Sequence, residues 1–195
     1  MSQNLPLNVL VPLATGCEEL EAVTIIDLLR RAGINVVTAS LYDQPVKCSR
    51  GTVIVADTTL QTILNDDFDL LVLPGGLPGA DNLNDDPRIH QLITRLASEN
   101  KPIGAICAAP KVLVSNGVLN GKKATAYPGS LNALDTLISS NNIKLNDTAV
   151  EIDGNVITSR GPGTVMDFAL TLIEVLLGKN AREQVETPLS RTTKT

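Results

Sequence analysis

The segment IGAICAAP, Ile103 to Pro110, decides both the fold and the candidate site. Its first four residues have the pattern of a short buried strand, and a helix is expected from about Ala109 to Ser115. Cys107 stands where the strand turns into the helix. A nucleophile elbow has this form: a strained backbone presents the nucleophile, and the next N–H faces an anion. The alternative is a buried, unreactive cysteine, since free cysteine packs as a small hydrophobic residue.

Strands and helices alternate on both sides of this segment. Apolar runs that end in turn residues predict strands at 8–13, 34–40, 52–56, 70–73 and 123–126. Apolar residues that recur every three or four positions predict helices at about 20–31, 86–100, from 162 or 164 to 177, and 181–185. We expect Thr15 and Glu18 to open the first helix as a capping box and Gly33 to end it.

This alternation predicts an α/β fold, in which a mostly parallel sheet carries helices on both faces. Residues 149–152 and 156–159 should add a C-terminal hairpin, because Asp153-Gly154 between them is a favoured turn. Ligands bind beyond the carboxyl ends of the strands in such sheets. The loops that leave those ends should share one edge: 15–19, 74–79, 107–110 and 160–164.

Composition limits the classes of function. The 195 residues predict one domain over 1–189 and a frayed tail at 190–195; 43% are hydrophobic but only 2% aromatic, so Val, Ile, Leu and Ala should build the core. A net charge of −5 argues against general nucleic-acid binding. We expect residues 1–13 to hold the first strand and no signal peptide, and no stretch is long enough to span a membrane.

The three cysteines show no metal-site spacing, and their odd number favours reduced thiols and a cytoplasmic location. A disulfide between Cys17 and Cys48 is the alternative. The only histidine, His90, should lie on the surface of its helix, which leaves a protease-like Cys-His pair without support. Neither the dinucleotide-binding nor the Walker glycine pattern occurs, so we expect no nucleotide site. The Cys, His, Asp and Glu residues lack the close paired spacings of zinc sites, so we expect no metal and no other cofactor.

Two features could assist Cys107. Glu21 belongs to an acidic helix start that ordinary capping explains in part, but its side chain could point inward. A desolvated carboxyl there would stay protonated and could donate a hydrogen bond to a thiolate, a form of Cys107 that the following helix start should favour. Gly75 and Gly76 follow a buried strand and could supply a second N–H to an oxyanion hole, or could form an ordinary tight turn.

Several motifs resemble those of the ThiJ/PfpI family in the class I glutamine amidotransferase-like superfamily, and in particular its parkinsonism-associated protein deglycase branch with the YajL-type proteins. The resemblance extends to about Leu189. The motifs are EELEAV at 18–23, DLLRRAGI at 27–34, CSRG at 48–51, VLPGG at 72–76, GAICAAP at 104–110 and TSRGPGT at 158–164.

The resemblance implies a flavodoxin-like three-layer sandwich, a homodimer, and a site in which Cys107 is the nucleophile and Glu21 the protonated carboxyl beside it. It implies that Gly76 and Ala108 supply backbone N–H groups. Arg31, Arg50, Gly75 and Tyr127 would support the pocket or the dimer interface, with Cys48 as a secondary thiol. The best-known members carry a histidine where this chain has Tyr127, which weakens any triad mechanism.

Two functions follow from the resemblance. The first is a cofactor-free enzyme that acts on reactive α-oxoaldehydes or their early adducts, as a glutathione-independent glyoxalase or a protein or nucleotide deglycase. The second is a redox-sensing chaperone for client proteins, in which Cys107 oxidises to a sulfinate with little turnover. Both depend on Cys107 and Glu21.

Overall fold

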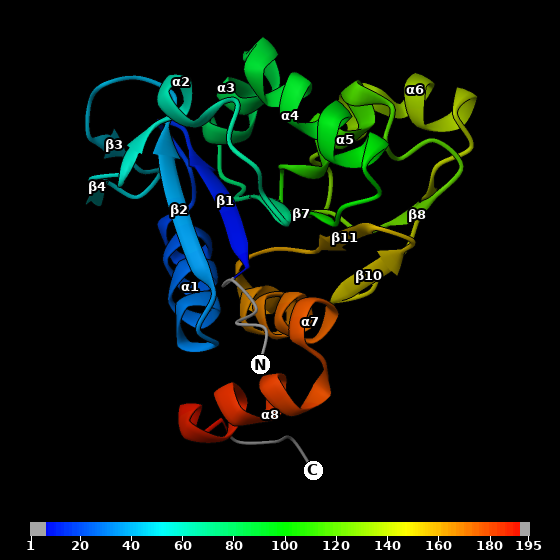
Figure 1. The fold of residues 1–195 in the computed structure, drawn as a ribbon. Helices are drawn as coiled ribbons and strands as arrows, with labels where there is room; N and C mark the ends of the chain where they lie inside the picture. The colour runs from blue at the N-terminus through cyan, green and yellow to red at the C-terminus, as the bar shows by residue number, and fades with distance from the viewer. Residues whose placement is uncertain (1–6, 192–195) are drawn as a thin grey trace.

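A seven-stranded sheet forms the middle layer of the computed structural model, which describes residues 7–191 (Figure 1). The strand order is β10-β11-β7-β6-β1-β2-β5, and every neighbouring pair is parallel except the hairpin of β10 and β11. The strands are β1 (Asn8–Leu13), β2 (Asn35–Ser40), β5 (Thr58–Thr59), β6 (Leu70–Leu73), β7 (Ile103–Ile106), β10 (Val150–Asp153) and β11 (Val156–Ser159). The predicted α/β sheet with a C-terminal hairpin is confirmed.

Helices cover both faces of this sheet (Figure 1). On one face α1 (Glu19–Arg31) packs against α7 (Val165–Leu177), with α8 (Lys179–Glu186) beyond it. On the other lie α2 (Leu60–Ile63), α3 (Gly79–Asp85), α4 (Pro87–Ser98) and α5 (Pro110–Asn116), and α6 (Asp135–Ser140) continues past α5. Gly33 follows α1 with φ +77°, as predicted.

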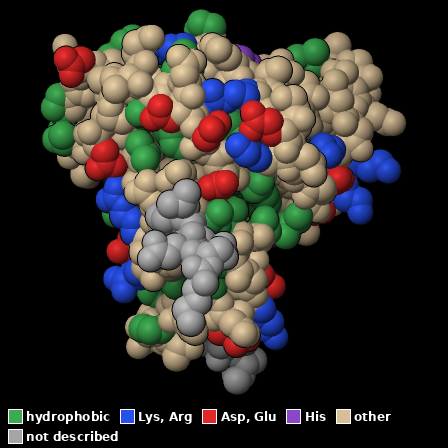
Figure 2. Space-filling view, viewed as in Figure 1, with side chains coloured by type: hydrophobic (Ala, Val, Ile, Leu, Met, Phe, Trp, Pro, Cys, Tyr) green, Lys and Arg blue, Asp and Glu red, His purple; other side chains and the backbone are tan. Residues whose placement is uncertain are grey.

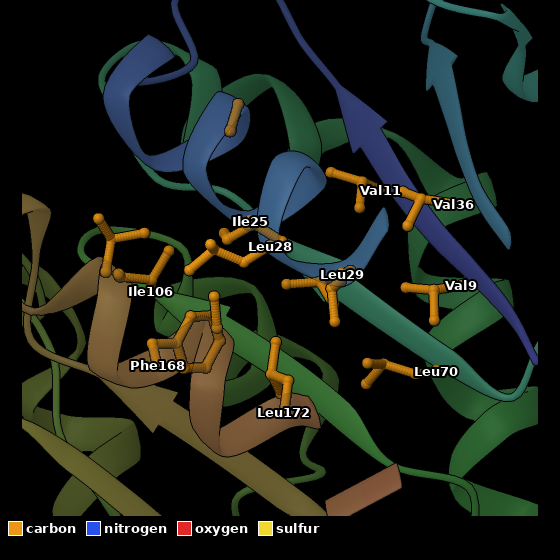
Figure 3. Close-up of a cluster of buried hydrophobic side chains, with 14 of the residues drawn as sticks. Val9, Val11, Ile25, Leu28, Leu29, Val36, Leu70, Ile106, Phe168 and Leu172 are labelled. Atoms are coloured by element: carbon orange, nitrogen blue, oxygen red, sulfur yellow. The ribbon is translucent and has the colours of Figure 1, made fainter. Parts of the chain in front are cut away.

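The central strands face two separate apolar cores, because successive side chains point to opposite faces of a sheet. Val9 and Val11 of β1 face the core under α1 and α7, whereas Leu10 faces the core under α3, α4 and α5. Figure 3 shows the first of these cores, where Phe168 is the only aromatic side chain drawn. A Cβ at Gly104 would lie 3.1 Å from the Phe168 ring, so the glycine of β7 makes room for it.

The sheet order determines where a ligand can bind. After β1 the chain adds β2 on one side of it, and later returns to add β6 on its other side. The loops after β1 and β6 therefore diverge at the carboxyl edge and leave a crevice, the usual ligand site of an open parallel sheet. Cys107 follows the next strand, β7, at this same edge.

Several predicted elements differ from the structure. The predicted strand 52–56 is only β4 (Val53–Ile54), which pairs with β3 (Val46–Lys47) outside the central sheet. Likewise, 123–126 contains only β8 (Lys123–Ala124), paired with β9 (Lys144–Leu145). Helix α3 lies outside the predicted elements. These segments are too short for a periodic pattern to reveal them.

The predicted capping box is wrong. Helix α1 begins at Glu19 with Glu18 as N-cap and no side-chain cap bond. The Glu18 and Glu19 carboxylates instead bind the segment before β4, where Ser49 Oγ donates to Glu18 Oε2 at 2.7 Å. Ser49 competes with the helix N-terminus for the Glu18 carboxylate, and the spacing of residues near Glu18 does not reveal this distant partner. Of the predicted frayed tail, 192–195 lie outside the described residues, whereas Arg191 is ion-paired with Asp167.

Within residues 7–191, no helix has both the length and the apolar character needed to cross a bilayer. Acidic and basic side chains are interspersed on the face shown in Figure 2.

Candidate active site

Cys107 occupies a strained strand-to-helix turn. Its φ is +62°, a left-handed value that costs a non-glycine residue free energy and that tightly held turns maintain. Two backbone hydrogen bonds hold it: the Cys107 N–H donates to Ser159 O at 2.9 Å, and its carbonyl accepts from the Tyr127 N–H at 2.9 Å. These bonds tie the turn to both neighbouring segments, so the backbone of this chain has the geometry of a nucleophile elbow.

Glu21 lies beside Cys107 and is fully buried. Helix α1 points Glu21 into the crevice. Leu20 and Val23 of the same helix point outward, and each is about half exposed. Glu21 Oε2 accepts the Gly75 N–H at 2.9 Å, while Oε1 has no hydrogen-bond partner within the described residues. A buried carboxylate with one unpaired oxygen is unfavourable, whereas a protonated carboxyl can use that oxygen as a donor.

Burial raises the pKa of Glu21 to about 7, although the Gly75 N–H and the neighbouring Cys107 act to lower it. Burial, and next the charge of Glu21, raise the pKa of Cys107 to about 12. The helix start alone does not make Cys107 an acidic thiol, because burial and the charge of Glu21 both raise its pKa. Desolvation outweighs the dipole, and the seven-residue helix α5 begins only at Pro110.

The two groups share their protons as a pair. Removing the first proton requires a pH of about 7, and the charge that forms opposes loss of the second. Above pH 7 the pair therefore carries one negative charge and one proton, and at pH 7 about half of the molecules are in this state. Moving that proton from the Cys107 sulfur to the Glu21 carboxyl creates a thiolate without changing the net charge of the buried site.

Two backbone N–H groups, from Gly76 and Ala108, interact with the Cys107 sulfur and lower its pKa. Gly76 has φ +88°, and a Cβ there would lie 2.4 Å from the Glu18 N atom, so only glycine fits. The N–H groups stabilise negative charge on the sulfur or on an oxygen bound next to it.

Cys107 lies at a cavity of about 600 Å³ and is 8% exposed. All four predicted edge loops contribute to its wall, and residues 49–50 and 127–130 complete it: Glu18, Ser49, Arg50, Gly76, Leu77, Cys107, Ala108, Tyr127, Pro128, Gly129, Ser130 and Pro162. The predicted gathering of these loops is therefore observed.

The remaining predicted residues lie in different places. Arg50 and the half-exposed Tyr127 line the cavity. Gly75 lies behind it, between Cys107 and Glu21. Arg31 lies on the last turn of α1, exposed and bound to Asp27 through Nε at 2.7 Å, so the structure does not bring it to this cavity.

Sequence analysis missed the role of Glu18 and Ser49 in the cavity wall. Their hydrogen bond joins segments 31 positions apart, and the only sequence signal was that Ser49 precedes Arg50 in the CSRG motif. His90, predicted on the surface of its helix, is half-buried, and its Nε2 lies 2.8 Å from Asn84 O. Among residues 7–191, no three His, Cys, Asp or Glu side chains are placed to hold a metal ion.

Adding one methyl group at Gly75 should damage the site. A Cβ there would lie 2.6 Å from Cys107 Cβ and 2.8 Å from Glu21 Oε2, and also 2.7 Å from Ile106 O, whose backbone cannot yield easily. We expect Gly75→Ala to lower the free energy of unfolding by about 2 kcal/mol and to change the rate of Cys107 alkylation by iodoacetamide at least about tenfold.

Gly163→Ala is the matched control for this variant, since nothing lies within 4 Å of a Cβ at this exposed glycine of a neighbouring edge loop. Thermal unfolding and timed alkylation of both variants provide the comparison. Equal behaviour of the two variants would contradict the tight packing of Gly75 against the pair.

The chain is similar to known proteins along most of its length. The model of the DJ-1/PfpI family matches residues 7–175. The chain is 42% identical over 182 residues to the Parkinson disease protein 7 homolog of Danio rerio, covering 92% of this chain and 95% of that protein. It is 36% identical over 172 residues to glutathione-independent glyoxalase DJR-1.2 of Caenorhabditis elegans, covering 88% and 89%.

A solved structure resembles the whole fold. The crystal structure of Drosophila melanogaster DJ-1beta superposes with a TM-score of 0.89 at 41% identity, covering 97% of this chain and 100% of that chain.

Proposed function

Since the chain belongs to the DJ-1/PfpI family, we propose that it is a cofactor-free enzyme that acts on reactive α-oxoaldehydes or their early adducts through Cys107 and Glu21. The observation that carries this proposal is the pairing of a thiol on a strained elbow with a buried carboxyl whose pKa is raised to about 7. Such a carboxyl both donates and accepts protons at neutral pH. A relative named as a glutathione-independent glyoxalase supports the substrate class.

The first step uses the single proton of the pair. The Cys107 proton moves to Glu21, and the thiolate adds to the aldehyde carbon of methylglyoxal. The carbonyl oxygen receives a proton from Glu21, which gives a hemithioacetal and leaves a carboxylate. The N–H groups of Gly76 and Ala108 stabilise the negative oxygen while it forms.

The second step returns the pair to its starting state. The Glu21 carboxylate takes the proton from the former aldehyde carbon while the ketone oxygen gains a proton, which gives an enediol. The proton then returns to the adjacent carbon as the hydroxyl on the former aldehyde carbon loses its proton, which produces a lactoyl thioester on Cys107. Water hydrolyses this ester to lactate and the free thiol. The net reaction consumes one water and no oxidant or reductant, so no redox cofactor is required for the balance.

The cavity also supports early adducts as substrates. Its volume of about 600 Å³ exceeds what a three-carbon aldehyde fills, and Arg50 and Tyr127 are available in its wall to contact the group that carries the adduct.

The assay is incubation of the reduced protein with methylglyoxal in the absence of glutathione, with lactate measured by an enzyme-coupled reaction. A second sample uses a glycated thiol, and intact mass is recorded in both. Catalytic formation of lactate or of free thiol supports the enzyme. Only stoichiometric modification of the protein in both samples would contradict it.

The second candidate is a redox-sensing chaperone, which one feature of the site favours. A sulfinate on Cys107 would place oxygens near the unpaired Glu21 Oε1 and the N–H groups of Gly76 and Ala108. In this alternative two peroxide molecules each transfer one oxygen to Cys107 and leave as water, turnover is negligible and the protein protects client proteins.

We further propose a homodimer in the cytoplasm. Leu20 and Val23 of α1 and Val53 and Val55 near β4 are each at least half exposed, and such apolar side chains are suited to an interface. Arg31 would lie near this interface.

A further inference from the structure

Two cysteines that the proposed reaction does not use lie side by side. The sulfur of Cys17, in the loop after β1, is 3.5 Å from the sulfur of Cys48, just after β3. Both are free thiols and buried, with 1% and 4% of their surfaces exposed. A covalent disulfide needs about 2.05 Å, so the sulfurs must approach by about 1.5 Å, a distance that small side-chain rotations supply.

The backbone around the pair is already held together. Gly16 N–H donates to Lys47 O at 2.8 Å, and Ser49 N–H donates to Cys17 O at 2.8 Å. These two bonds flank the sulfurs on both sides. The two segments therefore stay close without the covalent bond, so its formation requires no rearrangement of the chain.

We propose that Cys17 and Cys48 are a modification site for hydroperoxides, which convert the pair into a disulfide that fixes one wall of the Cys107 cavity. This inference does not rest on the proposed enzymatic activity. It concerns a second thiol chemistry, separate from that of Cys107.

Cys48 is the thiol that reacts first. Burial raises the pKa of both thiols, but the hydrogen bond between the two sulfurs offsets part of this rise at Cys48 and adds to it at Cys17. The Cys48 thiolate attacks one peroxide oxygen, which gives a sulfenic acid and releases water or an alcohol. Cys17 then attacks the sulfenic sulfur, the S–S bond forms and a second water leaves. Two thiols lose two electrons and one peroxide gains them.

The disulfide acts on the cavity through the residues next to it. Glu18 follows Cys17, Ser49 follows Cys48, and both line the cavity. Ser49 Oγ already donates to Glu18 Oε2 at 2.7 Å. A covalent bond one residue away restricts the separation of these two wall segments, whereas a single hydrogen bond permits it.

The test uses Cys107→Ala, which leaves only the pair. After treatment with hydrogen peroxide and removal of the excess, we expect the intact mass to fall by about 2 Da and no thiol to react with iodoacetamide in denaturant. The midpoint of thermal unfolding should rise by about 5 °C, and a dithiol reductant should reverse these changes. The double variant Cys17→Ala/Cys107→Ala should show neither the mass loss nor the rise.

Peptide mapping of oxidised wild-type protein provides an independent measurement, because a cross-linked peptide with Cys17 and Cys48 is expected there. The proposal would be overturned if Cys107→Ala kept both thiols reactive after treatment with a peroxide concentration that fully oxidises Cys107 in the wild-type protein. Added oxygen on Cys48 without a cross-link would also overturn it.

Discussion

Replacing Cys107 with serine should lower lactate formation from methylglyoxal by at least about a thousandfold. A serine hydroxyl fits the space of the thiol but keeps its proton far more tightly, so Glu21 cannot generate a nucleophile from it by a short proton transfer. The elbow and the cavity should be unchanged in Cys107→Ser, because two backbone hydrogen bonds hold residue 107 in its strained conformation. The value of kcat should therefore fall far more than the affinity for substrate.

Cys48→Ala is the control, measured under reducing conditions. Its thiol is buried and does not line the cavity, so we expect its activity to stay within about twofold of wild type. If Cys107→Ser retained a tenth of the activity or more, a thiolate at this position could not be the nucleophile.

Replacing Glu21 with glutamine should change how stability depends on pH. The carboxyl keeps its proton up to about pH 7 in the folded protein but loses it near its ordinary pKa of 4.5 in the unfolded chain. The unfolded state therefore releases the proton first as the pH rises. The protonated carboxyl gives its full stabilisation below pH 4.5, and this stabilisation is lost as the pH rises through 7. The free energy of unfolding falls by about 3 kcal/mol in total over this range.

Glutamine does not titrate. The free energy of unfolding of Glu21→Gln, measured relative to that of wild type, should therefore increase by about 3 kcal/mol between pH 4 and pH 8. Urea unfolding at several pH values measures this difference. Because burial is the largest cause of the raised pKa, the same gain is expected when both proteins also carry Cys107→Ser. A difference that stays constant from pH 4 to pH 8 would contradict the assignment of a protonated, buried Glu21.

The central sheet could be predicted from sequence because its signals are local. Each buried run, such as the one before Cys107, ends in turn residues, and the rule for parallel sheets then assigns all the following loops to one edge. That edge is where Cys107, Gly76 and Pro162 meet around the cavity. The inward position of Glu21 could only be suggested, because the apolar repeat of the helix includes Leu20, which is about half exposed in the structure.

The errors arose where long-range contacts prevail over local patterns. Glu18 could cap its helix by spacing, but Ser49 binds its carboxylate. The helix after Cys107 suggested an acidic thiol, yet desolvation and the charge of Glu21 raise its pKa, and neither is visible in spacing. The proximity of Cys17 to Cys48 likewise depends on two loops that meet only in the folded chain.

The hydrogen bond from the Tyr127 N–H to the Cys107 carbonyl uses only main-chain atoms, so it does not depend on which side chain residue 127 carries. A main-chain donor is present in every amino acid except proline, so drift at position 127 can exchange the ring without loosening the elbow. The phenol at this position can therefore be replaced without loss of the bond that holds residue 107. Selection can retune what enters the cavity at residue 127 and leave the nucleophile in place.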